Sequence, residues 1–279
     1  MKTIGLIGGT SWSSTIEYYR YINQAVADRL GGLHSARIVL ANVEFHFLEE
    51  AMHSNRWDVA SSILKDEASR LVAAGVNGIV MCSNLIHKMF DEVQASVPVP
   101  ILHIADALAE EIHARGYRCV ALLGAKTTME DSFYSRRIEE RSGARVLIPA
   151  ATHRHYMNIA IFRRMCCNIY TDSDRARFNK IIDGLKKQGA EGVILGCTEL
   201  PVLLTESSLP LLNSTLVHSM RAVEWAFADE QPLPVGAAPA QQLGQCTWEG
   251  GSMAVRIARN HMGNSRLNNG RLLDQRKPQ

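Results

Sequence analysis

Short apolar runs alternate with longer segments of helical periodicity over the first 228 residues. Runs of four to eight apolar residues bounded by turn residues predict buried strands. They cover residues 3–9, 36–43, 78–82, 98–104, 120–125, 192–196 and 210–213. Apolar residues with the spacing of one helix face follow at 59–74, whereas 44–56 reads as a polar connection. Strands that alternate with helices predict an α/β fold with parallel sheets.

This pattern occurs twice along the chain. Residues 189–198 repeat residues 75–84 without a gap, so that Cys197 corresponds to Ser83, 114 residues earlier (197 − 83). Motifs of the first and last strands repeat at similar offsets of 116 and 110 residues (124 − 8 and 213 − 103). Offsets that drift by a few residues are typical of a duplicated unit with loop insertions. We therefore predict two pseudo-symmetric, doubly wound α/β lobes with parallel sheets, whose strand ends form an interlobe active-site cleft.

The expected division of the chain follows from this repeat and from its composition. We expect residues 1–98 together with 213–228 to form lobe 1, and residues 99–212 to form lobe 2. From residue 229 onward the chain is rich in Gln, Gly, Pro, Asn and Arg and has little periodicity. This composition predicts a disordered C-terminal tail over residues 229–279.

Composition and charge exclude several classes of function. A formal net charge of +2 without a basic face gives no reason to expect a nucleic-acid partner, and no apolar run reaches the ~18 residues of a membrane span. Six cysteines without a framework spacing indicate free thiols in a reducing cytoplasm. Neither a CxxC nor an HExxH pattern occurs, so we expect no metal site. The glycine turn at Gly8-Gly9 is not a GxGxxG motif; it is either a tight turn or a source of backbone N–H groups for a carboxylate.

The candidate chemistry lies at the ends of the two repeated strands. Inversion of a carbon centre needs one acid or base on each face of the substrate, and a symmetric cleft supplies one from each lobe. Cys197 follows a buried strand and precedes a helix, where a lowered thiol pKa would make it a base. The register puts Ser83 at the opposite position. Cys82 is the rival, and it is disfavoured because a slip of one residue along a strand reverses the direction of the side chain. Thr198 and Asn84 could bind a carboxylate.

The chain resembles the aspartate/glutamate racemase superfamily, specifically its acidic amino-acid racemases that need no pyridoxal phosphate. Six motifs within roughly the first 228 residues carry the resemblance. They are IGLxGGxSWxST at 4–15, GGLHSA at 31–36, the CTNTxHK-type segment at 82–88, LHIADA at 102–107, ALLGxxxTMExxFY at 121–134 and GCTEL at 196–200. The family's fold is a pair of pseudo-symmetric α/β lobes, which agrees with the repeat.

The resemblance implies an amino-acid racemase that uses neither cofactor nor metal, with a small amino acid as its ligand and a homodimer as the usual assembly. It assigns catalysis to Cys197 and Ser83. It also implies a substrate-binding group and a supporting group. The first contains Thr10, Asn84, Leu85, Thr198 and Glu199, and the second contains Gly9, His87, Cys82 and Arg163. A serine hydroxyl is a far weaker acid than a thiol, so Ser83 implies lower activity or a preference for one enantiomer.

Three departures from the family pattern weaken the expectation of an acidic substrate. Met52 stands where a polar residue helps to read the side-chain carboxylate, and Asn213 replaces an aspartate. The segment from Ile161 to Asn168 has two arginines; either Arg163 or Arg164 supplies the missing cation, or both are solvated. The sequence therefore leaves two other functions open: a one-cysteine decarboxylase or cis-trans isomerase on the same scaffold, and a degenerate amino-acid-binding protein.

Overall fold

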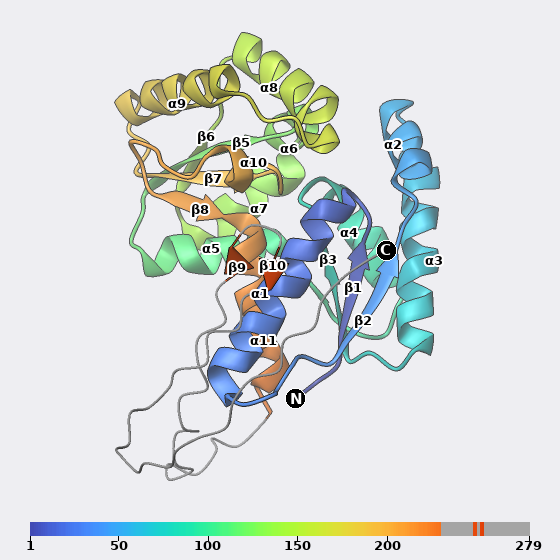
Figure 1. Cartoon of the computed structure of the whole chain (residues 1–279). Helices are drawn as coiled ribbons and strands as arrows, with labels where there is room; N and C mark the ends of the chain where they lie inside the picture. The colour runs from blue at the N-terminus through green and yellow to red at the C-terminus, as the bar shows by residue number, and fades with distance from the viewer. Residues whose placement is uncertain (230–247, 250–251, 254–279) are drawn as a thin grey trace, which may run out of the picture. The chain divides into compact units, whose positions relative to one another are not determined.

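The computed structural model describes residues 1–229, 248–249 and 252–253, and its main body contains two four-stranded parallel sheets (Figure 1). The first has the order β2-β1-β3-β4 and the second the order β6-β5-β7-β8. The strands are β1 (Ile4–Gly8), β2 (Ile38–Asn42), β3 (Gly78–Met81), β4 (Ile101–Leu102), β5 (Cys119–Gly124), β6 (Arg145–Leu147), β7 (Gly192–Gly196) and β8 (Leu211–Asn213). The matching orders confirm the predicted pair of α/β lobes.

Helices cover both sheets. They are α1 (Trp12–Leu30), α2 (Phe45–His53), α3 (Trp57–Ala73), η1 (Leu85–Met89), α4 (Phe90–Ala95), α5 (Ile104–Ala114), α6 (Lys126–Glu130), α7 (Ser132–Ser142), α8 (Ala151–Arg163), η2 (Met165–Cys167), α9 (Asp172–Lys187), α10 (Leu200–Leu203) and α11 (Ser214–Phe227). The polar connection expected over 44–56 is wrong, because this segment contains α2. Leu48, Ala51 and Met52 bury one face of α2, while its charged residues face away.

The last helix of each repeat packs on the opposite lobe. After β4 in the first sheet, α5 packs against α7, and Ile104 and Leu108 enter the core of the second lobe. After β8 in the second sheet, α11 packs against α1, and Val223 and Phe227 enter the core of the first lobe. The strand β4 pairs with β3, so the first sheet extends beyond the expected boundary at residue 98, to Leu102. Asn213, which was expected to begin the second part of lobe 1, ends β8 of the second sheet.

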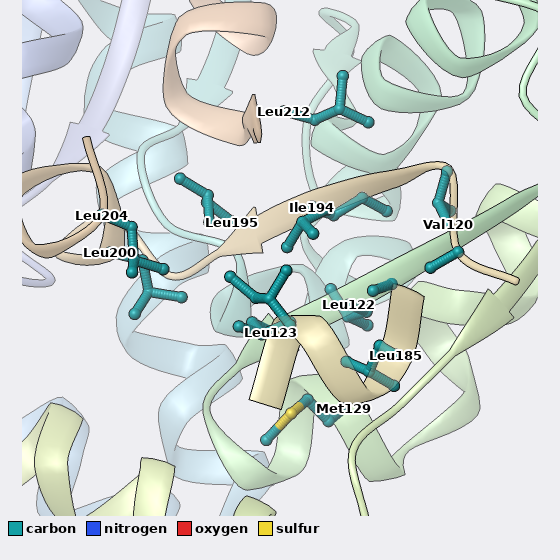
Figure 2. Packing of buried hydrophobic residues seen from close by; sticks show 14 of the residues in the cluster. Val120, Leu122, Leu123, Met129, Leu185, Ile194, Leu195, Leu200, Leu204 and Leu212 are labelled. Carbon is teal, nitrogen blue, oxygen red and sulfur yellow. The ribbon is translucent and has the colours of Figure 1, made fainter. Parts of the chain in front are cut away.

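The core of the second lobe forms around β5 and β7, whose residues are buried on both faces of the sheet (Figure 2). Leu122, Leu123 and Ile194 are fully buried there and pack among residues of α9 and α10. Side chains buried on both faces explain the near-continuous apolar runs. At the strand ends Gly124 lies so close to β7 that a Cβ atom would come within 2.7 Å of the Gly196 carbonyl oxygen.

Three buried histidines join the two lobes at the start of α5. The His87 Nε2 accepts from the Ile104 N–H at 3.3 Å, and the His103 Nδ1 accepts from the Ala105 N–H at 3.0 Å. The His218 Nε2 donates to the Leu102 carbonyl at 2.9 Å. His87 and His103 each accept a hydrogen bond with a ring nitrogen, which only neutral imidazole can do, and His218 needs a single N–H for its bond. Burial lowers the pKa of His87 to about 4 and that of His218 to about 3, and it also lowers the pKa of His103.

The antiparallel pair β9 (Trp248–Glu249) and β10 (Ser252–Met253) is described separately from the lobes. Of the predicted disordered tail over 229–279, residues 230–247, 250–251 and 254–279 lie outside the described part of the chain. Within that part, no helix is both long and apolar enough to cross a membrane.

These histidines predict a loss of stability in mild acid. In the unfolded chain they titrate near pH 6.5, so between pH 6.5 and 4 the unfolded state binds protons that the folded state does not. Each of His87 and His218 should therefore cost about 2 kcal/mol of unfolding free energy at pH 5 relative to pH 7. Urea unfolding at the two pH values measures this loss.

Substitution separates the buried histidines from other acid effects. His218→Gln should reduce the dependence of the unfolding free energy on pH, even where it lowers stability at pH 7. His34→Gln, at an exposed position, provides the control for replacing an imidazole by an amide. Equal pH dependence in wild type and His218→Gln would contradict the assignment.

Candidate active site

A cavity forms where the carboxyl ends of the strands from both lobes meet. The turns after β1, β3, β5 and β7 all contribute, as expected for α/β sheets. The lining residues are Thr10, Ser11, Phe45, Met52, Ser83, Asn84, Leu85, Ile86, Ala125, Thr128, Ile161, Phe162, Cys166, Gly196, Cys197, Thr198 and Glu199. We call this space the inner cavity. All five sequence-predicted substrate-binding residues and both predicted catalytic residues line it.

Ser83 and Cys197 lie at equivalent places in the two lobes. Ser83 follows β3 and Cys197 follows β7, and both half-buried side chains line the inner cavity. Cys82 is fully buried instead among the core residues of the first lobe, and its Sγ lies 3.8 Å from the Val80 carbonyl oxygen. Burial raises the pKa of the Cys82 thiol, and the alternation of side chains along the chain keeps it out of the cavity.

The Cys197 thiol donates a hydrogen bond to Glu199. The Cys197 Sγ lies 2.9 Å from Glu199 Oε2. Burial and the nearby Glu199 carboxylate raise the thiol pKa well above its ordinary value. The expectation that the following helix lowers the pKa is therefore wrong: Cys197 is a protonated thiol next to a proton acceptor.

Glu199 is held by groups from both lobes. Its side chain is 4% exposed and also accepts from the Thr198 hydroxyl at 3.0 Å and from the Ser14 hydroxyl at 3.1 Å. Ser14 lies in the first turn of α1, in the first lobe, and its single hydroxyl proton is shared between Glu199 Oε1 and Thr198 Oγ1, which is 2.6 Å away. These hydrogen bonds fix the carboxylate beside Cys197 and connect the lobes directly at the site.

The inner cavity contains polar groups that are free to bind a ligand. The Asn84 amide is oriented by the Tyr134 hydroxyl, which donates to its Oδ1, and by Ser214, whose Oγ accepts from its Nδ2 at 3.1 Å. One N–H of Asn84 stays free of these two bonds. The buried hydroxyls of Thr10 and Thr128 have no hydrogen-bond partner in the described residues.

Thr128 was missed by the sequence reasoning. It lies on the short helix α6 after β5, within the ALLGxxxTMExxFY motif at 121–134. A threonine in a helix gives no signal of a binding role. Its burial at the cavity with an unpaired hydroxyl is what distinguishes it, because a buried hydroxyl normally has a partner.

Gly9 is a structural residue of the turn after β1. Its N–H donates to Thr15 Oγ1 at 2.9 Å, so it is not available to a substrate carboxylate. The φ angle of +92° and the closeness of Val43, whose carbonyl oxygen would lie 2.3 Å from a Cβ atom, both require glycine. Of the two interpretations of this turn, the tight turn is confirmed for Gly9.

His87 supports the turn that presents Ser83. Because its Nε2 accepts a hydrogen bond, its Nδ1 is the protonated nitrogen and donates to the Ser83 carbonyl oxygen at 2.8 Å. His87 is not among the cavity-lining residues. It acts on the site through the backbone of Ser83.

Arg163 lines a second, larger cavity of about 780 Å³, which we call the outer cavity. The outer cavity shares Phe45, Met52, Leu85, Phe162 and Cys166 with the inner one. Arg164 does not supply a cation to either, because its guanidinium is paired with Asp174 at 2.6 Å. Asn213 caps α11 by accepting from the Leu216 N–H at 3.2 Å, so this departure from the family pattern lies outside the cavities.

Known proteins share this architecture. A Yersinia pestis crystal structure, provisionally assigned as an Asp/Glu racemase, is 41% identical, covers 81% of this chain and 100% of its own, and superposes with a TM-score of 0.76. An aspartate racemase homologue from Pyrococcus horikoshii is 33% identical over 81% of this chain and 99% of its own, with a TM-score of 0.70.

A more distant relative is the broad specificity amino-acid racemase RacX of Bacillus subtilis. It is 23% identical over 163 residues, which are 57% of this chain and 68% of the relative. The sequence model of the Asp/Glu/Hydantoin racemase family matches residues 7–226, so the match spans both lobes with their paired strand ends. The chain therefore belongs to the Asp/Glu/Hydantoin racemase family.

Proposed function

We propose that this protein racemises an α-amino acid without pyridoxal phosphate, with Cys197 on one face of the substrate and Ser83 on the other. The observation that carries the proposal is that these two residues follow equivalent strands of the two lobes and line one cavity. The family membership and the racemase relatives agree with it. Among the described residues, no lysine lines the inner cavity.

The proton transfers begin at the Cys197–Glu199 pair. The Sγ–H proton passes to Glu199 Oε2, which already accepts the hydrogen bond from Cys197. The thiolate then removes the proton from Cα, and the electron pair of the broken C–H bond delocalises into the α-carboxylate. In the reverse direction the thiol returns a proton to the same face. Glu199 is thus a positioning and proton-accepting residue for Cys197.

The α-carboxylate needs hydrogen-bond donors that strengthen as it takes up negative charge. The unpaired hydroxyls of Thr10 and Thr128 and the remaining N–H of Asn84 are such donors in a buried site, and the Asn84 amide is already held in place by Tyr134 and Ser214. The Thr198 hydroxyl is engaged with Ser14 and Glu199, so its part is to hold Glu199. Leu85 contributes an apolar surface rather than a hydrogen bond.

Ser83 limits the opposite face. Its hydroxyl is a poor acid and a poor base compared with a thiol, so proton delivery from this side is slow. Exchange of the α-proton of the enantiomer that faces Cys197 should exceed full racemisation. A preference for one enantiomer follows from this asymmetry.

The remaining expectations stay predictions. The described cysteines are free thiols, which suits a reducing cytoplasm. The homodimer implied by the resemblance and the expected absence of a nucleic-acid partner also remain predictions. The acidic substrate implied by the resemblance also remains a prediction.

Proton exchange at Cα tests the mechanism. NMR in deuterated water with L- and D-amino acids should show deuterium at Cα with wild type and none with Cys197→Ala. Ser83→Cys should raise racemisation by on the order of 10²-fold, because a thiol replaces the hydroxyl on the slow face. Cys167→Ser, which removes an exposed thiol that does not line the inner cavity, is the matched control and should leave the rates unchanged.

Other results would identify the alternatives. Exchange that survives in Cys197→Ala would contradict the role of this thiol. Release of carbon dioxide or double-bond isomerisation without exchange would indicate the one-cysteine enzymes. Thermal stabilisation by an amino acid without any turnover would indicate a binding protein.

Glu199→Gln tests the proton acceptor. Removal of the carboxylate charge should lower the pKa of the Cys197 thiol, because the negative charge no longer disfavours the thiolate. Iodoacetamide labelling of the Cys197 peptide, followed by mass spectrometry, should therefore proceed at lower pH than in wild type. Exchange at Cα should nevertheless fall, since the acceptor is gone. The peptide with exposed Cys167 serves as the internal control; an unchanged Cys197 labelling profile together with unchanged exchange would refute the pairing.

A further inference from the structure

The inner cavity is lined by two chemically different groups of residues. Its polar group includes Thr10, Ser83, Asn84, Thr198 and Glu199. Five of its apolar residues, which we call the apolar wall, are Phe45, Met52, Leu85, Ile161 and Phe162. From this division we infer that the substrate is an amino acid with an uncharged, apolar side chain that packs on the apolar wall. The inference rests on the proposed racemase function and names its substrate class.

The apolar wall is built by matching parts of both lobes. Phe45 and Met52 lie on α2, which follows β2, and Ile161 and Phe162 lie on α8, which follows β6. These are equivalent positions in the repeat, so both lobes present an apolar helix face to the same cavity. Met52 is nearly fully buried and Ile161 is 1% exposed. A hydrocarbon side chain that enters this apolar surrounding loses its own contact with water, which favours its binding.

The charges in the inner cavity disfavour a second substrate carboxylate. Among the described residues, Glu199 is the one acidic side chain that lines this cavity, and no arginine, lysine or histidine lines it. A side-chain carboxylate here would lose its hydration without gaining a cation, and it would share the cavity with the negative charge of Glu199. An uncharged side chain avoids both costs.

The basic side chains of this region line the outer cavity. Lys126, Arg163 and His53 line the outer cavity and do not line the inner one. Phe45, Met52 and Phe162 of the apolar wall line both, so they form the boundary between the two spaces.

Substrate preference tests the inference. Deuterium exchange at Cα should be faster with methionine and leucine than with aspartate and glutamate, by at least about tenfold in kcat/KM. Met52→Arg places a cation in the apolar wall and should reverse the order, raising exchange of aspartate and glutamate and lowering that of methionine. Met52→Leu keeps the wall apolar at similar volume and should preserve the wild-type order.

The results separate this inference from the proposed function. Faster exchange of aspartate than of methionine, dependent on Cys197, would overturn the inference and leave the racemase intact. Loss of that aspartate exchange in Arg163→Ala would then identify Arg163 as the cation that reads the carboxylate. Absence of exchange with all of these amino acids would count against the racemase itself.

Discussion

Each lobe covers its sheet with a helix that begins at the last strand of the other lobe. The helix α5 leaves β4 of the first sheet and enters the second core, and α11 leaves β8 of the second sheet and enters the first core. Burial of apolar surface is the dominant favourable term in folding, so neither core is complete without its partner. This reciprocal packing places the carboxyl ends of the two sheets opposite each other, and the active site depends on that placement.

The site adds polar contacts to this apolar framework. Buried polar groups need partners, and here many of the partners come from the other lobe. Ser14 reaches Thr198 and Glu199, and Tyr134 reaches Asn84. Lys88 also pairs with Asp131 across the lobes. The same contacts orient the Cys197–Glu199 pair and the Asn84 amide proposed to bind the substrate carboxylate. The chemistry and the association of the lobes therefore use the same side chains.

The sequence allowed the lobes and the paired positions to be predicted, because the repeat carries its own register. Ser83 rather than Cys82 faces the cavity, as the gap-free alignment with Cys197 indicated. The helix α2 was missed because the charged residues on its exposed face masked a short apolar face. The roles of Ser14 and Thr128, and the raised pKa of Cys197, could not be predicted. They depend on which groups from distant segments become neighbours, and on how much water those groups lose.

The exchange of α5 and α11 also constrains how such a chain could have arisen. If the two repeats descend from one ancestral unit, that unit ended in a helix with no sheet of its own to cover. Two copies could have closed their cores by trading these helices around a two-fold axis, as in a domain-swapped dimer. Gene fusion would then have turned an intermolecular exchange into an intramolecular one. It would also have freed the two equivalent positions to diverge, so that they could come to carry Ser83 in one copy and Cys197 in the other.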